Sequence, residues 1–119
     1  AQSMSGLYAD GMALTNSVIG YGVPTSIGIE ETFSNLNATA DRLSKMADVG
    51  YEIYAYEVLH TTQAMDMRKQ DGKQMGQGTT KLLDGYRKVV PFVTKDRIFT
   101  PDINTGLKFL KSYQIPANN

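Results

Sequence analysis

The run from Glu30 to Arg68 is predicted to form one long helix, and it constrains the fold more than any other part of the sequence. At about 1.5 Å per residue this helix would be roughly 58 Å long. A compact domain of this chain length has a radius of gyration of about 13 to 14 Å, so a straight helix of that length would project from it. The sequence therefore predicts a long-helix bundle segment that completes a larger helical oligomer.

Apolar residues recur on two faces of this predicted helix. One face carries Phe33, Leu36, Ala40, Leu43, Ala47, Gly50, Tyr54, Val58 and Met65. The second carries Met46, Ile53, Tyr56 and Leu59. Between Ile53 and Leu59 the helix is thus apolar around much of its circumference, which is typical of a helix surrounded by other helices.

Three shorter helices are expected around the long one. The first spans residues 4–18. Another starts at a Thr79 or Thr80 cap and runs to about Val90, where Pro91 ends it. The last starts at Thr100-Pro101-Asp102, with the threonine as cap candidate and the proline in the first turn. Residues 68–78 are polar and glycine-rich, which favours a loop. The fold class is accordingly all-α, with residues 1–119 as a single segment.

Composition excludes several classes of protein. The formal net charge is zero and the basic residues are scattered among acids, which argues against a nucleic-acid partner. No cysteine is present, so disulfides and thiolate metal sites are excluded. No apolar stretch reaches the roughly 18 residues of a membrane span. The start at Ala1 is consistent with a proteolytic fragment, a chain trimmed by signal peptidase, or extra residues before Met4; the cytoplasm is the expected compartment.

Three sets of residues, in the same order and at the same separations, resemble the histidine and aromatic amino-acid ammonia-lyases. The set at residues 55–68 contains Glu57, Gln63-Ala64 and Asp66-Met67-Arg68. The downstream set contains Arg87-Lys88-Val89-Val90-Pro91-Phe92, Asp96-Arg97 and Pro101-Asp102-Ile103, and the upstream set contains Pro24-Thr25-Ser26, Glu30-Glu31 and Ser34. The resemblance covers nearly the whole chain, but only the C-terminal fifth or so of a family member.

This resemblance implies a helical homotetramer that eliminates ammonia from an α-amino acid to give an α,β-unsaturated acid. It also implies a methylidene-imidazolone electrophile, formed from an Ala-Ser-Gly triplet. This chain has no such triplet, and Met4-Ser5-Gly6 is the nearest approach to one. The expected arrangement is therefore a carbon-nitrogen lyase that is inactive as this chain alone, with a larger partner chain supplying the electrophile and the N-terminal catalytic part.

Glu30 is the candidate catalytic residue that the resemblance implies. It aligns with a glutamate that faces the substrate in histidine ammonia-lyases, where a carboxylate could hold a cationic group or move a proton. An acid in a first helical turn is otherwise commonly a solvated residue that complements the helix dipole. The family's Asn-Gln and Asp-His around this position are Gly28-Ile29 and Glu31-Thr32 here. Histidine is thus in doubt as the substrate, and a related amine, or a trimethylated one as in ergothionase-like members, stays open.

Other candidate site residues have ordinary structural explanations. His60 and Glu57 share one side of the helix, but a carboxylate-histidine metal site needs several more ligands, so no metal is expected. Tyr51, Tyr54 and Tyr56 are expected to be core residues. The basic residues Arg68, Lys69 and Lys73 are expected to be solvated, contact with a substrate carboxylate being the alternative. Asp96 and Arg97 could form a local ion pair.

Other functional hypotheses remain beside the lyase. One is a non-catalytic helical module for structure or interaction, derived from the same fold. Another is an aminomutase of the same family. A third is a free-standing periplasmic protein trimmed at Ala1. Whether the chain is a fragment or a separate small subunit is also open at this stage.

Overall fold

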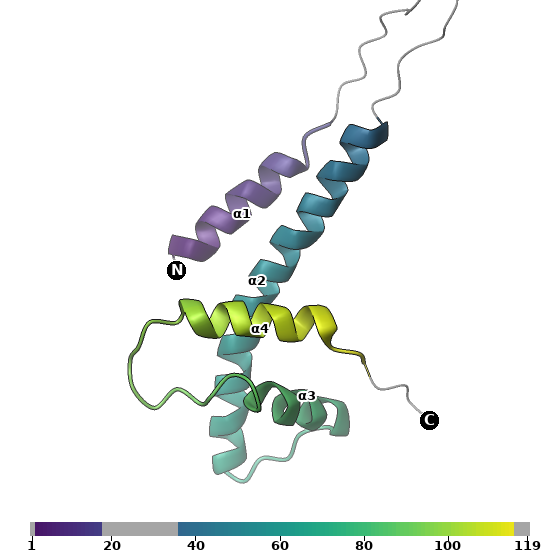
Figure 1. Ribbon diagram of the computed structural model, residues 1–119. Helices are drawn as coiled ribbons and strands as arrows, with labels where there is room; N and C mark the ends of the chain where they lie inside the picture. Colours follow the sequence, from purple (N-terminus) through teal and green to yellow (C-terminus); the bar gives the residue numbers. More distant parts are fainter. Residues whose placement is uncertain (1, 18–35, 116–119) are drawn as a thin grey trace, which may run out of the picture. The chain divides into compact units, whose positions relative to one another are not determined.

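The computed structural model describes residues 2–17 and 36–115, which form four helices (Figure 1). They are α1 (Gln2–Leu14), α2 (Leu36–Gln70), α3 (Gln77–Arg87) and α4 (Thr100–Ser112). No strand occurs in these ranges, so the all-α prediction is confirmed. None of the helices in the described ranges combines the length and the apolar character that a membrane crossing requires.

The predicted long helix exists as α2, which has 35 residues. At the usual rise per residue it is about 52 Å long. The chain divides into two compact units, Ala1–Gly50 and Tyr51–Asn119, and α2 contributes to both. The predicted start of this helix at Glu30 lies outside the described residues.

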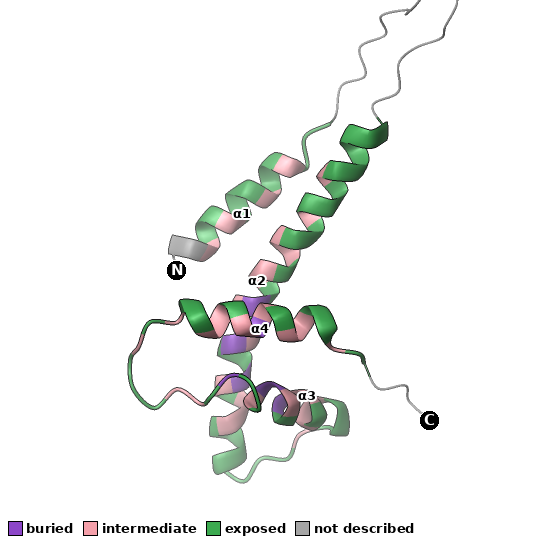
Figure 2. Cartoon of the chain, in the orientation of Figure 1, coloured by how far each residue is buried: buried purple, intermediate pink, exposed green. Residues whose placement is uncertain are grey.

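In the first unit, α1 and the beginning of α2 run antiparallel. The Arg42 guanidinium donates a hydrogen bond to the carbonyl oxygen of Asn16. Nearer the start of α1 and further along α2, a Cβ atom built on Gly11 would meet Val49 at 3.5 Å, an ordinary van der Waals distance. Even so, no residue whose burial is described in this unit is fully buried (Figure 2). The described contacts therefore leave both helices largely open to solvent.

The core lies in the second unit, where α2, α3 and α4 contribute its side chains (Figure 2). Leu59 of α2, Tyr86 of α3 and Val90 are its buried members. Partly buried apolar residues pack around them: Val58, Phe99, Ile103 and Phe109. The ring of Phe109 meets that of Tyr86 edge-on, with centroids 5.6 Å apart. Such aromatic pairs add about 0.5–1.5 kcal/mol beyond the area that they bury.

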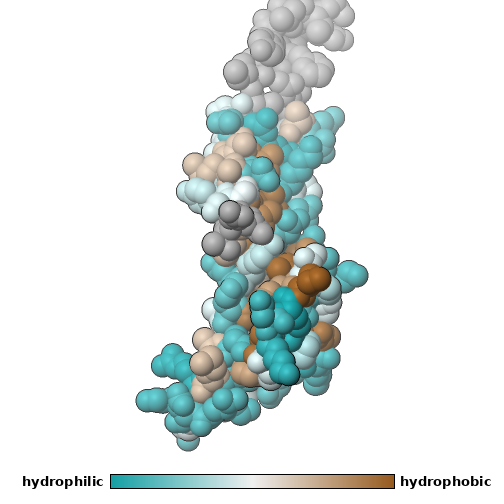
Figure 3. All heavy atoms as spheres, turned by 90° about the vertical axis from the view of Figure 1, so that its left-hand side faces the viewer, coloured by the Kyte–Doolittle hydropathy of each residue, from teal (hydrophilic) through white to brown (hydrophobic). Residues whose placement is uncertain are grey.

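The two predicted apolar faces of α2 have different surroundings. Of the second face, Leu59 is buried, and Met46, Ile53 and Tyr56 are half-buried. The first face includes Leu36, Leu43 and Tyr54, which are 71%, 61% and 60% exposed. The core prediction for the tyrosines is thus wrong at Tyr54, and at Tyr51, which is 40% exposed although the Lys111 ammonium lies 5.6 Å from its ring centroid. Figure 3 shows hydrophobic residues among hydrophilic ones on one face of the molecule.

The end of α2 shows why residues 68–78 are only partly a loop. The helix continues to Gln70, and Gly72 then adopts a positive φ of 73°. The amide of Gly72 donates to the Lys69 carbonyl, and that of Lys73 donates to the Arg68 carbonyl. This is the Schellman arrangement, in which glycine takes the left-handed position at low steric cost.

The boundaries of α3 differ from those predicted. This helix begins at Gln77 after Gly76, so neither Thr79 nor Thr80 is its cap; the Thr80 hydroxyl donates back to the Gly76 carbonyl. It ends at Arg87, three residues before the predicted end at Val90. Pro91 has no N–H to continue the helical bonds and disfavours helical geometry in the residue before it, which accounts for the early end.

The start of α4 is close to the prediction. Pro101 lies in the first turn and Asp102 follows it, as expected. Thr100, however, is the first helical residue rather than the cap. The capping position is held by Phe99, which makes no side-chain capping bond.

Gly106 allows α4 to approach the buried Tyr86 ring. A Cβ atom at this position would lie 2.8 Å from the Tyr86 hydroxyl oxygen and 3.2 Å from Cε2. Real Cβ atoms essentially never come so close, so any side chain here would displace either the ring or the helix. The absence of a side chain at residue 106 is therefore a packing requirement of the core.

Gly106→Ala is expected to lower the free energy of unfolding by about 1–3 kcal/mol, because overpacking forces neighbouring groups to shift. Combining it with Tyr86→Phe should recover part of the loss, since the nearest atom is then absent. Denaturant unfolding of the full chain measures both effects. Gly78→Ala in α3 is the matched control, because nothing lies within 4 Å of its Cβ position. Equal losses in the two alanine variants would contradict the packing argument.

Candidate functional site

Residues from two of the sets singled out in the sequence are joined by polar contacts in the second unit. Gln63 of α2 makes two hydrogen bonds with the backbone of Val93. Its Nε2 donates to the Val93 carbonyl at 2.9 Å, and its Oε1 accepts from the Val93 amide at 3.0 Å. One amide side chain thereby satisfies both backbone groups of a residue that belongs to no helix. We call this pair of bonds the Gln63 clasp.

A second link joins Asp66 of α2 to Arg87 at the end of α3. The Arg87 Nε donates to Asp66 Oδ2 at 2.5 Å, and Nη1 donates to the Val90 carbonyl at 3.1 Å. The guanidinium carbon also lies 5.6 Å from the Tyr86 ring centroid and 5.9 Å from that of Phe92. Since the Asp66 and Arg87 side chains are only 20% and 16% exposed, this pair is better shielded from solvent than a surface ion pair.

Arg97 forms the third link, and its partner corrects the predicted pair with Asp96. The Arg97 Nε donates to Asp102 Oδ2 of α4 at 2.8 Å, and Nη2 donates to the Pro91 carbonyl at 3.1 Å. Asp102 therefore has a polar contact as well as its place in the first turn of α4. Together the three links tie the segment between α3 and α4 to α2, α3 and α4.

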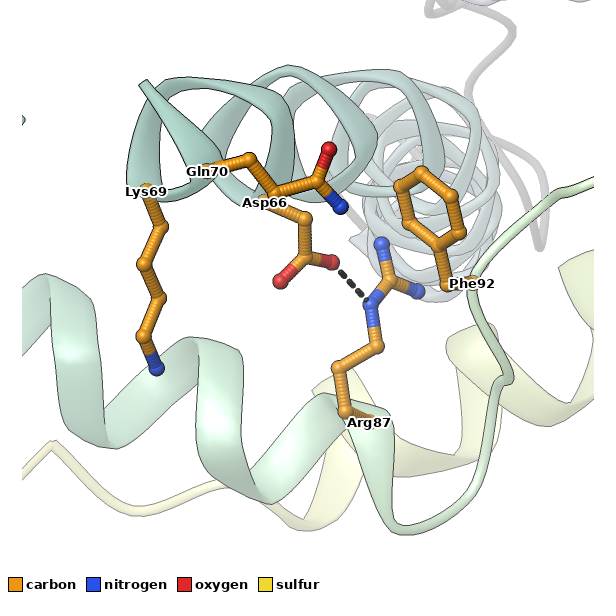
Figure 4. Close-up of a pocket in the computed structure, with 5 residues that line it drawn as sticks. All are labelled: Asp66, Lys69, Gln70, Arg87 and Phe92. Atoms are coloured by element: carbon orange, nitrogen blue, oxygen red, sulfur yellow. Dashed lines mark hydrogen bonds and ion pairs between the residues drawn. The ribbon is translucent and has the colours of Figure 1, made fainter. Parts of the chain in front are cut away.

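A pocket of about 460 Å³ opens beside the second link (Figure 4). It is lined by Asp66, Lys69, Gln70, Arg87 and Phe92. The first three project from the last turns of α2, Arg87 projects from α3, and Phe92 lies in the following segment. The sequence patterns indicated Asp66, Arg87 and Phe92 as parts of family-like motifs, but did not indicate that they share a cavity with Lys69 and Gln70.

The predicted catalytic residue, Glu30, lies outside the described residues. His60 is described and exposed, and its Nδ1 lies 2.7 Å from the Tyr56 carbonyl oxygen. A carbonyl can only accept, so Nδ1 carries the proton in this contact. Within the described ranges, no three histidine, cysteine, aspartate or glutamate side chains are grouped so as to hold a metal ion.

Comparisons with known proteins agree on one family. A family model described as aromatic amino acid lyase matches residues 1–88. Histidine ammonia-lyase from Pseudomonas fluorescens (strain SBW25) is 34% identical over 100 residues, which cover 81% of this chain and 19% of that protein. Histidine ammonia-lyase from Chloroflexus aurantiacus is 29% identical over 117 residues, which cover 92% of this chain and 22% of that protein. The chain therefore spans about a fifth of the length of these curated relatives.

A solved structure is also similar. It is the ergothioneine-degrading enzyme ergothionase from Treponema denticola, crystallised in complex with desmethyl-ergothioneine sulfonic acid. The similarity has a TM-score of 0.83 at 31% sequence identity, and covers 93% of this chain and 22% of that one. At this level of identity and coverage, both the sequence and the helical arrangement of the chain are similar to those of the solved enzyme.

Gln63→Glu is expected to lower the free energy of unfolding by about 1–3 kcal/mol, because a carboxylate cannot donate to the Val93 carbonyl and would face it instead. Gln74→Glu makes the same chemical change at an exposed loop position and should alter stability by less than about 0.5 kcal/mol. Denaturant unfolding compares the two variants. If they behave alike, the Gln63 clasp does not stabilise the fold.

Alkaline pH is expected to destabilise the wild type more than Tyr86→Phe. Burial raises the pKa of the Tyr86 hydroxyl above its ordinary 10.0, an effect that Asp102 reinforces and Arg87 opposes. In the unfolded chain the hydroxyl ionises near its ordinary pKa. The stability it contributes is therefore complete below that value and is lost as pH rises toward the higher folded pKa.

The measurement is the unfolding free energy of both proteins from about pH 8 to about pH 11, which spans the ordinary tyrosine pKa. At the lower end the variant should be at least as stable as the wild type, because the buried hydroxyl has no hydrogen-bond partner among the described residues. Identical slopes above pH 10 would contradict the assignment.

Proposed function

This chain belongs to the aromatic amino acid lyase family, and from that premise we propose that it is the C-terminal portion or small subunit of an ammonia-lyase-like enzyme. The reaction would eliminate ammonia, or an amine, from a histidine-like or aromatic α-amino acid to give an α,β-unsaturated acid. The observation that carries this proposal is the match over residues 1–88, supported by the similarity to ergothionase over 93% of the chain.

The electrophile of this reaction would come from a larger partner chain. Methylidene-imidazolone, when present, supplies the electron sink that makes loss of the amine feasible. The sequence contains no Ala-Ser-Gly triplet from which such a group could form. The residues of this chain therefore do not fit the group as its source, and their proposed contributions are a wall of the site and the oligomer core.

The exposed apolar face of α2 supports the proposed assembly. Leu36, Leu43 and Tyr54 recur at separations of seven and eleven residues, which places them on one side of a helix. Each is at least 60% exposed. Further helices of a larger chain, in a tetrameric bundle, would remove this apolar surface from water. The cytoplasm stays the predicted compartment.

Glu30 is the proposed catalytic residue of this chain. Its carboxylate would hold the ammonium or side-chain cation of the substrate, or move a proton in the elimination. The sequence around it puts histidine in doubt as the substrate and leaves open a related amine or a trimethylated one. The ergothionase similarity supports the trimethylated alternative, because that enzyme degrades ergothioneine.

The proposal is tested by co-purifying the chain with the larger chain that it binds, and following the absorbance of the conjugated acid formed from histidine, phenylalanine, tyrosine or ergothioneine. We expect activity from the complex and none from the chain alone. Glu30→Gln should lower kcat/KM by about a hundredfold or more, in the usual range for loss of a general acid or base. Glu31→Gln is the matched control and should retain activity.

Two results would replace the proposal with another hypothesis. A complex that releases a β-amino acid instead of an unsaturated acid would be an aminomutase. A chain whose native mass is that of a folded monomer, with no larger partner, would favour the non-catalytic module. If Glu30→Gln and Glu31→Gln are equally active in a working lyase, Glu30 has no catalytic role.

A further inference from the structure

The pocket at the end of α2 has a size suited to a small molecule. Its volume of about 460 Å³ lies within the range of roughly 300–1,000 Å³ that is usual for such sites. Its five lining residues belong to the second unit, and the only one among them that the sequence offered for substrate contact is Lys69. The pocket therefore needs an explanation of its own.

The lining carries both signs of charge. Asp66 uses one carboxylate oxygen to accept from Arg87 Nε. Figure 4 shows the other oxygen pointing away from Arg87, toward the side of the pocket where Lys69 lies. Lys69 is exposed and supplies a flexible ammonium group at this side. The pocket thus presents an acceptor and a cation that a ligand could reach together.

Arg87 holds the acceptor in position. Its Nε and Nη1 are occupied by Asp66 and by the Val90 carbonyl, and Tyr86 and Phe92 lie near its guanidinium. Its buried Nη2 has no hydrogen-bond partner among the described residues. Arg87 is therefore a positioning residue, which fixes the Asp66 carboxylate and leaves Lys69 as the accessible cation.

Phe92 adds an aromatic wall. It is half-buried, and Figure 4 shows its ring beside the Arg87 guanidinium, at the opposite side of the pocket from Lys69. Aromatic rings bind flat groups by offset or edge-on contacts. A ligand that extends from Lys69 past Asp66 to this ring would need an anion, a cation and a flat group, in that order.

We propose that this pocket binds a zwitterionic α-amino acid with a flat side chain. The ligand carboxylate would pair with Lys69, its ammonium with the free oxygen of Asp66, and its side chain with Phe92. In an α-amino acid the two charged groups are attached to the same carbon, so one ligand satisfies both neighbouring charges. Binding here involves no chemical step and does not depend on the lyase proposal.

In the test, the full chain is titrated with L-phenylalanine or L-histidine. Binding is monitored through the backbone amide NMR shifts of residues 66–70 and 92. Dissociation constants of about 1 mM or tighter are expected for a site of this kind. 3-Phenylpropanoate lacks the ammonium and phenethylamine lacks the carboxylate, and each should bind about tenfold more weakly than L-phenylalanine, as expected for loss of one charged contact.

Lys69→Met provides the decisive variant, because this exposed residue makes none of the three links between the segments. It should weaken the binding of L-phenylalanine about tenfold and leave the binding of phenethylamine unchanged. Only the amino acid has a carboxylate that loses its partner when Lys69 is replaced. Lys73→Met removes the same charge at an exposed position outside the pocket and should change the binding of neither ligand.

Two outcomes would overturn the proposal. One is the absence of shifts at residues 66–70 and 92 up to about 10 mM of either amino acid, a concentration that would detect even weak binding. The other is an equal effect of Lys69→Met on L-phenylalanine and phenethylamine. The NMR shifts and the dissociation constants do not depend on turnover, so an inactive lyase complex would not contradict this pocket proposal. Failure of the binding test would equally leave the lyase proposal unaffected.

Discussion

The second unit depends on the burial of Tyr86 where α2, α3 and α4 supply the core. This side chain is fully buried, packs with Leu59 and Val90, and meets Phe109 edge-on. Its hydroxyl reaches α4 at Gly106, the one glycine among the described residues at which an added Cβ atom would come within 3 Å of a neighbouring group. Hydrophobic burial drives this packing, and the glycine makes it sterically feasible. The other described features of the unit surround this contact.

Polar contacts then determine the path of the chain between α3 and α4. The Gln63 clasp, the Asp66–Arg87 pair and the Arg97–Asp102 pair each join residues of different segments. Gln63, Arg87 and Arg97 also bond backbone groups that lie outside the helices. These bonds remove the penalty of leaving such groups unpaired when they are shielded from water. The same arrangement brings two cations, a carboxylate and a ring around one pocket. A network that stabilises the segment has thereby also produced a cavity with an ordered set of charges.

The exposed apolar residues of α2 bear on how the chain assembles with other helices. One apolar face of α2 is largely covered within the chain, whereas Leu36, Leu43 and Tyr54 on the other are exposed, and the relatives are more than four times as long as the chain. An exposed apolar face on so long a helix is what a segment of a larger bundle would carry. Sequence periodicity predicted both faces, since each depends only on residue type and helical spacing. Periodicity could not show which face the chain covers, because that depends on where the other helices pack.

The sequence by itself determined the helical class, the existence of the four helices and the family, because these follow from periodicity, breakers and local motifs. It also indicated Val58 and Leu59 on the apolar faces of the long helix, and both contribute to the core. Only the tertiary structure decided that Arg97 pairs with Asp102 rather than Asp96, and that Lys69 and Phe92 line one pocket. The ion pair depends on how the chain turns as it enters α4, and the pocket depends on residues that are distant in sequence, and neither is encoded in a local pattern.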